Sequence, residues 1–149
     1  MDLKEILKTV ETVLVVDWPS REVPESLVLA GFQVFVHGGP GPEDYSVYEL
    51  SNGKVVDRRT GREPERADLV YSYRPLGELP GIVATATRLG ARTVWTQSGV
   101  SDGGAIDPKG CWVPEQELQA ARNLVQSAGL NYVHDPYIGD VVREIGAVR

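Results

Sequence analysis

The chain contains short, uninterrupted runs of β-branched and aliphatic residues, and each run is followed by a segment with helical spacing or a loop. The first run, Thr12 to Val16, is too short for a buried helix and shows no alternation of apolar and polar residues. Such a run is typical of a parallel strand that is covered on both faces. Strands are predicted at 12–16, 32–36, 67–73, 92–97 and 130–134.

Helical segments lie between these runs. The clearest covers 114–128, where Pro114 stands at the first turn, acidic residues follow it and Gly129 ends the pattern. Further helices are predicted at 2–10, 25–30, 76–89 and 137–145. Because strand–helix–strand crossovers are right-handed, the alternation predicts an α/β fold, a Rossmann-like doubly wound parallel sheet of about five strands with helices on both faces. With 149 residues, the chain suits a single domain over 1–149.

Residues 45–60 depart from this alternation. Two strand-like segments flank Asn52-Gly53, a pair that favours the positive φ angles of a tight hairpin turn. We therefore expect a small inserted β-hairpin here. Arginines follow it in mixed-charge sequence, which predicts a solvated connector, with an anion-binding patch as the alternative. These arginines are Arg58, Arg59, Arg62 and Arg66.

Composition excludes several classes of function. The 15 Lys and Arg residues against 21 Asp and Glu give a net charge of −6, which repels polyanions and argues against general nucleic-acid binding. No run of 18 or more apolar residues is present, so the sequence predicts no membrane insertion. The single cysteine, Cys111, allows no internal disulfide, and the charged start of the chain does not look like a secretion signal. A cytoplasmic protein is expected.

Ligands of doubly wound sheets bind at the carboxyl ends of the strands, where the strand order reverses. Arginine there can hold phosphate through its planar fork, glycine lets a ligand approach the backbone, and hydroxyl and amide groups add hydrogen bonds. Each position also has an ordinary structural interpretation, such as a helix cap at Ser20 or a flexible turn at Gly38. The candidate binding residues are Ser20, Arg21, His37, Gly38, Arg74, Pro75, Gln97, Ser98, Gly99 and Val100.

No catalytic or metal-binding set is predicted. Cys111 precedes a helix and could be activated there, but a free cysteine commonly behaves as a small hydrophobic residue. His134 and Asp135 are adjacent in a strand, so their side chains point to opposite faces and are poorly placed to act as a pair. The loop 101–107 lacks the acidic spacing of a calcium loop.

Two segments of the sequence carry a family resemblance. The run from Arg92 to Val100, followed by a helix, a short strand and His134-Asp135-Pro136, is similar to a motif of small single-domain CoA-binding proteins. These resemble the CoA-binding domain of succinyl-CoA synthetase. The turn Tyr73-Arg74-Pro75 also matches that family. The resemblance implies that CoA, an acyl-CoA or a related adenine nucleotide is bound near Ser20 and Arg21, with help from Arg74.

The sequence departs from that family at the end of the first strand, where Asp17 stands in place of a glycine. A carboxylate beside a pyrophosphate costs binding energy unless it is paired, and Arg21 is the expected partner. The resulting hypothesis is non-catalytic or regulatory binding of a small-molecule nucleotide. The alternative is a ligand-free Rossmann-like protein-interaction module, in which Val47, Leu50 and Val55 of the hairpin form an apolar face for a second copy of the chain or another protein.

Overall fold

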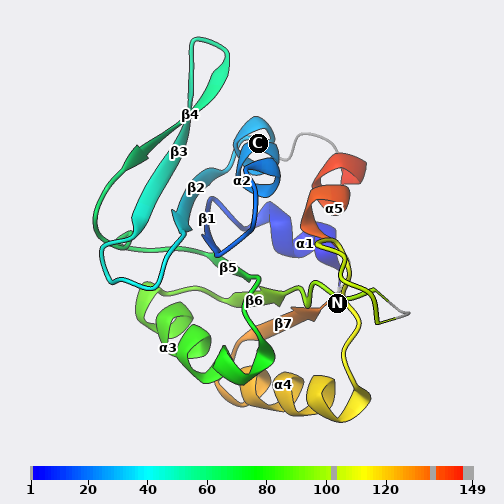
Figure 1. Ribbon diagram of the computed structural model, residues 1–149. Coiled ribbons are helices and arrows are strands. Elements are labelled where there is room, and N and C mark those ends of the chain that lie inside the picture. Colours follow the sequence, from blue (N-terminus) through cyan, green and yellow to red (C-terminus); the bar gives the residue numbers. More distant parts are fainter. Residues whose placement is uncertain (1, 102–103, 135–136, 146–149) are drawn as a thin grey trace.

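The computed structural model describes residues 2–101, 104–134 and 137–145, and within these residues a seven-stranded sheet lies between two layers of helices (Figure 1). The strand order is β4-β3-β2-β1-β5-β6-β7. The strands are β1 (Thr12–Val16), β2 (Gln33–His37), β3 (Tyr45–Ser51), β4 (Lys54–Arg59), β5 (Leu69–Ser72), β6 (Thr93–Thr96) and β7 (Asn131–His134). The helices are α1 (Leu3–Lys8), α2 (Glu22–Leu29), the 3-10 turn η1 (Leu76–Glu78), α3 (Leu79–Leu89), α4 (Glu115–Ser127) and α5 (Ile138–Ile145).

The five predicted strands form the parallel part of the sheet, in the order β2-β1-β5-β6-β7. All five residues of β1 are buried, which explains the uninterrupted apolar run there. Their side chains alternate between the faces: Val13 and Val15 belong to one hydrophobic cluster, and Leu14 and Val16 to the other. The predicted Rossmann-like α/β class is confirmed.

The hairpin is present where it was predicted, but it is not a separate excursion. Strand β3 pairs antiparallel with β2, so the hairpin extends the sheet to seven strands instead of about five. Without it, β2 would be an edge strand with unpaired N–H and C=O groups. Asn52 and Gly53 adopt the positive φ angles expected of the turn, 51° and 79°.

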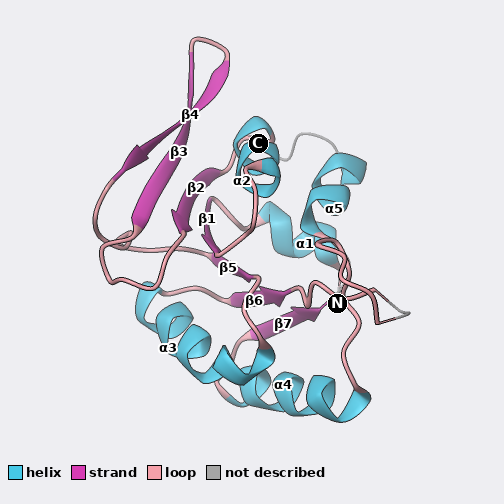
Figure 2. Ribbon diagram, viewed as in Figure 1, coloured by secondary structure: helices cyan, strands magenta, loops and turns pink. Residues whose placement is uncertain are grey.

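Helices cover the two faces of the sheet unequally (Figure 2). Helices α1, α2 and α5 pack on the face that presents Val13 and Val15, while α3 and α4 pack on the opposite face.

Helix α2 begins at Glu22, three residues before the predicted start. The earlier start makes Pro24 the third residue of α2. N–H groups in the first turn of a helix have no partner within the helix, so proline is tolerated there. Among the described helices, none has the length and apolar character needed to cross a membrane.

Candidate functional site

A cavity of about 530 Å³ lies where the strand order reverses. The chain passes from β1 into α2 on one face of the sheet and from β5 into α3 on the other face. The loops that leave the carboxyl ends of these two neighbouring strands therefore run in opposite directions here. The end of β1, the loop 37–40 after β2 and the first turns of α3 form its walls. We call it the switch-point cavity. It is the position at which the sequence predicts a ligand.

Arg74 spans the switch-point cavity between two carboxylates. Its Nη1 lies 2.6 Å from Oδ2 of Asp17, and its Nε and Nη2 donate to Glu78 at 3.1 and 2.5 Å. The hydrogen bonds to Glu78 and Asp17 raise the pKa of Arg74, so the cation is held firmly charged. The expected partner of Asp17 was Arg21, and this expectation is wrong.

Asp17 has a φ angle of 61°, in the left-handed region that most residues avoid. Glycine reaches this conformation without strain, which gives a physical reason for the glycine that relatives carry at the position, as the sequence resemblance implies. Aspartate is one of the few other residues that tolerate it. The substitution therefore preserves the backbone path and adds a carboxylate to the cavity.

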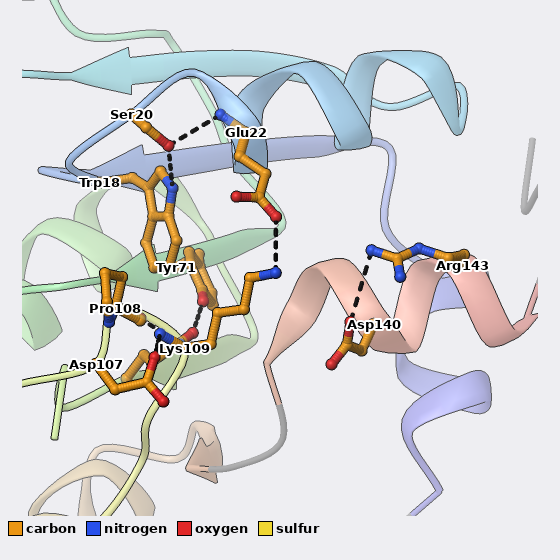
Figure 3. Close-up of polar contacts among 10 residues, drawn as sticks. Trp18, Ser20, Glu22, Tyr71, Asp107, Pro108, Lys109, Asp140 and Arg143 are labelled. Carbon is orange, nitrogen blue, oxygen red and sulfur yellow. Dashed lines mark hydrogen bonds and ion pairs between the residues drawn. The ribbon is translucent and has the colours of Figure 1, made fainter. Parts of the chain in front are cut away.

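Arg21 lies away from the switch-point cavity, against the hairpin. Its guanidinium donates to Asp57 at 2.6 Å and to Glu25 at 3.0 Å, and it sits 4.9 Å from the centre of the Tyr48 ring. The side chain of the preceding residue, Ser20, contacts the first residue of α2 (Figure 3). Its hydroxyl oxygen accepts hydrogen bonds from the Glu22 N–H and from Trp18 Nε1, at 3.2 and 3.1 Å. The structure thus gives Ser20 a hydrogen-bonding role just before α2, whose N-cap residue is Arg21, and gives Arg21 a role in fixing the hairpin.

His37 and Gly38 do line the switch-point cavity. The His37 ring stacks on Tyr45 with centroids 4.3 Å apart, and its Nε2 donates to the Gly41 carbonyl at 2.9 Å. Asp44 folds the same loop by accepting the Gly41 N–H at 2.8 Å. The loop that borders the cavity is therefore fixed by its own contacts, with glycine backbone facing little obstruction at Gly38.

The segment Gln97 to Val100 anchors the long loop 98–113 and does not line the switch-point cavity. Gln97 is fully buried, accepts a hydrogen bond from the Tyr71 hydroxyl and donates to the Pro108 carbonyl at 2.6 Å. Gly99 has a φ of 75° and packs on the Tyr73 hydroxyl. Pro75 lines a different hollow, between η1 and α4. The sequence placed these residues at the correct sheet edge, but the structure brings only Asp17, His37, Gly38 and Arg74 together.

In a comparison with known proteins, residues 16–139 match the family described as CoA binding domain. The chain belongs to the CoA-binding domain family. Its fold is similar to the crystal structure of Prb, described as PH1109 protein redesigned for binding, with 18% identity and a TM-score of 0.60 over 95% of this chain and 88% of that one. It is also similar to cell-free ID.343 from Thermus thermophilus, with 21% identity and a TM-score of 0.56 over 98% and 100%. No curated protein matches significantly.

A second hollow of this CoA-binding domain lies at the carboxyl ends of β6 and β7, with Cys111 and His134 in its lining. Both ring nitrogens of His134 are engaged: Nδ1 lies 2.7 Å from the Thr96 hydroxyl, and Nε2 contacts the Cys111 carbonyl. Asp135 lies outside the described residues. Within the described residues, no group of three or more His, Cys, Asp or Glu side chains could hold a metal ion.

An ion pair that no sequence pattern predicts connects Lys109 of the loop 98–113 to the start of α2. Lys109 Nζ lies 3.1 Å from Glu22 (Figure 3). The same Nζ lies 5.2 Å from the centre of the Tyr137 ring. The hydrogen bond from Lys109 lowers the pKa of Glu22, while burial and the neighbouring Glu22 raise that of Tyr137. These residues come from three distant parts of the chain, so no local spacing signals the contact.

The apolar hairpin face suggested by the sequence does not form. Val47 is buried within the sheet, and Val55 packs against the cluster beneath α2. Of these three residues, Leu50 alone is well exposed, at 56%. The face is lost because Leu50 and Val55 are cross-strand partners on one face of the hairpin, whereas Val47, three residues from Leu50 along β3, lies on the other face.

Proposed function

We propose that the protein binds CoA, an acyl-CoA or a related adenine nucleotide in the switch-point cavity without transforming it. The observation that carries this proposal is the position of Arg74, a charged fork at the reversal of strand order in a CoA-binding domain. Guanidinium groups bind phosphate oxygens through paired hydrogen bonds. At Gly38 the backbone of the adjoining loop leaves room for a phosphate or sugar to approach.

A phosphate must share Arg74 with Asp17 and Glu78. The Arg74 side chain is 39% exposed, and ion pairs at such positions contribute little to stability because water screens them. A phosphate oxygen can therefore replace one carboxylate at small cost to the fold. A non-catalytic role is consistent with His134, whose two nitrogens are both occupied.

The test measures binding of CoA, acetyl-CoA, ATP and NAD to the whole chain by calorimetry and by thermal melting. The R74A variant should bind the CoA compounds at least about tenfold more weakly, since it removes a charge-assisted contact. R143A is the matched control, because Arg143 is an exposed arginine of α5 and is not part of the cavity lining. Equal affinity of R74A and the unmodified protein would overturn the assignment of the site.

One observation favours the alternative of a ligand-free interaction module: Asp17 and Glu78 already satisfy Arg74. A ligand at 100 times its dissociation constant stabilises a protein by about 2.7 kcal/mol, a shift of several degrees at this size. Absence of any shift at millimolar CoA, acetyl-CoA, ATP and NAD would favour the module.

A further inference from the structure

The arginine-rich segment after the hairpin encloses a cavity of about 550 Å³. Residues 60–66 form one side of it, and the exposed surface of β2 and β4 forms the other. We call it the connector cavity. It shares no lining residue with the switch-point cavity, and its volume falls in the range of small-molecule sites.

The connector is held in place at several points. The N–H groups of Thr60 and Gly61 donate to the Tyr45 carbonyl at 2.9 and 3.2 Å. Glu63 accepts two hydrogen bonds from Arg88 of α3, both 2.8 Å long, and Pro64 is buried. The cavity therefore keeps its shape without a ligand, and binding would cost little ordering of the backbone.

Positive charge is concentrated in the lining of the connector cavity. Four of its side chains are arginines and two are glutamates, in a chain whose net charge is −6. Of the glutamates, Glu63 is matched by Arg88, which lies outside the lining. The arginines in the lining are Arg58, Arg59, Arg62 and Arg66.

The arginines retain donors for a ligand. Arg58, Arg59 and Arg66 pair with Glu49, Asp44 and Asp68, carboxylates that all lie outside the lining. Each pair uses only one or two of the five N–H groups of a guanidinium. Arg62 forms no ion pair within the part of the chain that the structure describes.

An aromatic ring contributes to the floor of the cavity. Phe35 of β2 is half-buried. It is the cross-strand partner of Val47 in β3, and Val47 is the cross-strand partner of Arg58 in β4. Paired residues of neighbouring strands project from the same face, so the ring and the guanidinium belong to one surface. An aromatic face suits a planar ring, and guanidinium groups suit phosphate oxygens.

We propose that the connector cavity is a second binding site, for a small organic phosphate that carries a planar ring, such as a nucleoside monophosphate. The ring stacks on Phe35 and the phosphate is held by Arg62 with the neighbouring arginines. The carboxylate of Glu65 lowers the preference of the site for highly charged polyphosphates. This site goes beyond the proposed function, because its residues and its ligand are independent of Arg74.

The test titrates the whole chain with AMP, adenosine and inorganic phosphate, with binding followed by calorimetry. AMP should bind at least about tenfold more tightly than either fragment, because only AMP uses both the ring and the phosphate contact. R62A and F35L should each weaken AMP binding by about fivefold or more. E65Q should strengthen it by removing a like charge, an effect that general destabilisation would not produce.

Three controls separate this site from the switch-point cavity and from nonspecific binding. R74A alters only the switch-point cavity, so the AMP site that is sensitive to R62A should remain in R74A with its affinity unchanged. R143A, which removes an exposed arginine of α5, should leave AMP binding unchanged. Loss of AMP binding in R74A but not in R62A would place the nucleotide in the switch-point cavity and overturn the proposal. Equal affinity for AMP and inorganic phosphate, or no saturable binding of AMP at millimolar concentration, would overturn it as well.

Discussion

The carboxylate of Asp17 lies 2.6 Å from the guanidinium of Arg74, and both side chains line the cavity at which the strand order reverses. The contact joins the exits of two neighbouring parallel strands, β1 and β5. It has two opposite effects on an anionic ligand. Asp17 orients the arginine toward the cavity, but it also repels a phosphate and competes with it for the same donors. Affinity at this site therefore depends on the balance between the two residues.

Removal of the Asp17 charge should strengthen CoA binding. In D17N the side chain keeps its tolerance of positive φ, while the repulsion of phosphate disappears. We expect affinity for CoA to rise about three- to tenfold, measured by calorimetry. D57N is a suitable control, since Asp57 pairs with Arg21 outside the cavity. Weaker binding in D17N would mean that orientation of Arg74 matters more than charge.

Gly99 should tolerate no side chain. A Cβ at this position would lie 2.5 Å from the Tyr73 hydroxyl oxygen, and the φ of 75° adds strain for any L-residue. G99A should lower the free energy of unfolding by about 2–4 kcal/mol, measured by urea denaturation. G129A separates the two causes, because Gly129 has a φ of 82° and open space around it. Equal losses in both variants would show that the contact with Tyr73 is unimportant.

Local patterns predicted the elements of this fold well, because each depends on neighbouring residues. The buried run Thr12–Val16 and the turn at Asn52-Gly53 are signals of this kind. The sequence could not show that the hairpin joins the sheet, since that pairing depends on which edge of the parallel sheet is left open.

The site was predicted less completely than the fold. Proximity in the chain suggested Arg21 as the partner of Asp17, whereas the partner is Arg74, 57 residues away. The exits of β1 and β5 become neighbours only through sheet pairing, and no spacing in the sequence encodes it. The same reason hides the contact between Lys109 and Glu22. Sequence reasoning thus identified the correct edge of the sheet, but not the contacts made there.

The buried pair of Tyr71 and Gln97 should be important for the loop 98–113. Y71F removes the hydroxyl that donates to the Gln97 side-chain oxygen and leaves that buried acceptor without its donor. The expected loss is about 1–3 kcal/mol of unfolding free energy, together with faster proteolysis within the loop. Y73F is the control, because the Tyr73 hydroxyl forms no hydrogen bond with another described residue. Unchanged stability and unchanged proteolysis in Y71F would contradict this role.

Asp68 should make stability depend on acid pH. Its carboxylate accepts hydrogen bonds from the N–H groups of Thr12 and Glu11 at 3.0 and 2.9 Å, at the starts of β1 and β5. Burial acts to raise the pKa of Asp68, but these hydrogen bonds and the one from Arg66 outweigh it, so the pKa lies below its usual value of 3.8. The folded protein therefore binds this proton less readily than the unfolded chain does.

It follows that the stabilisation by Asp68 is fully present above about pH 4 and is lost as the pH falls through the lowered pKa. At neutral pH the free energy of unfolding of D68N should be about 1–3 kcal/mol lower than that of the unmodified protein. This difference should shrink in acid. Urea denaturation at several pH values between about 7 and 2.5 measures it. D140N should differ little at any pH, since Asp140 is 53% exposed. A D68N difference that stayed constant down to the lowest pH would show that its cause is packing and not the carboxylate charge.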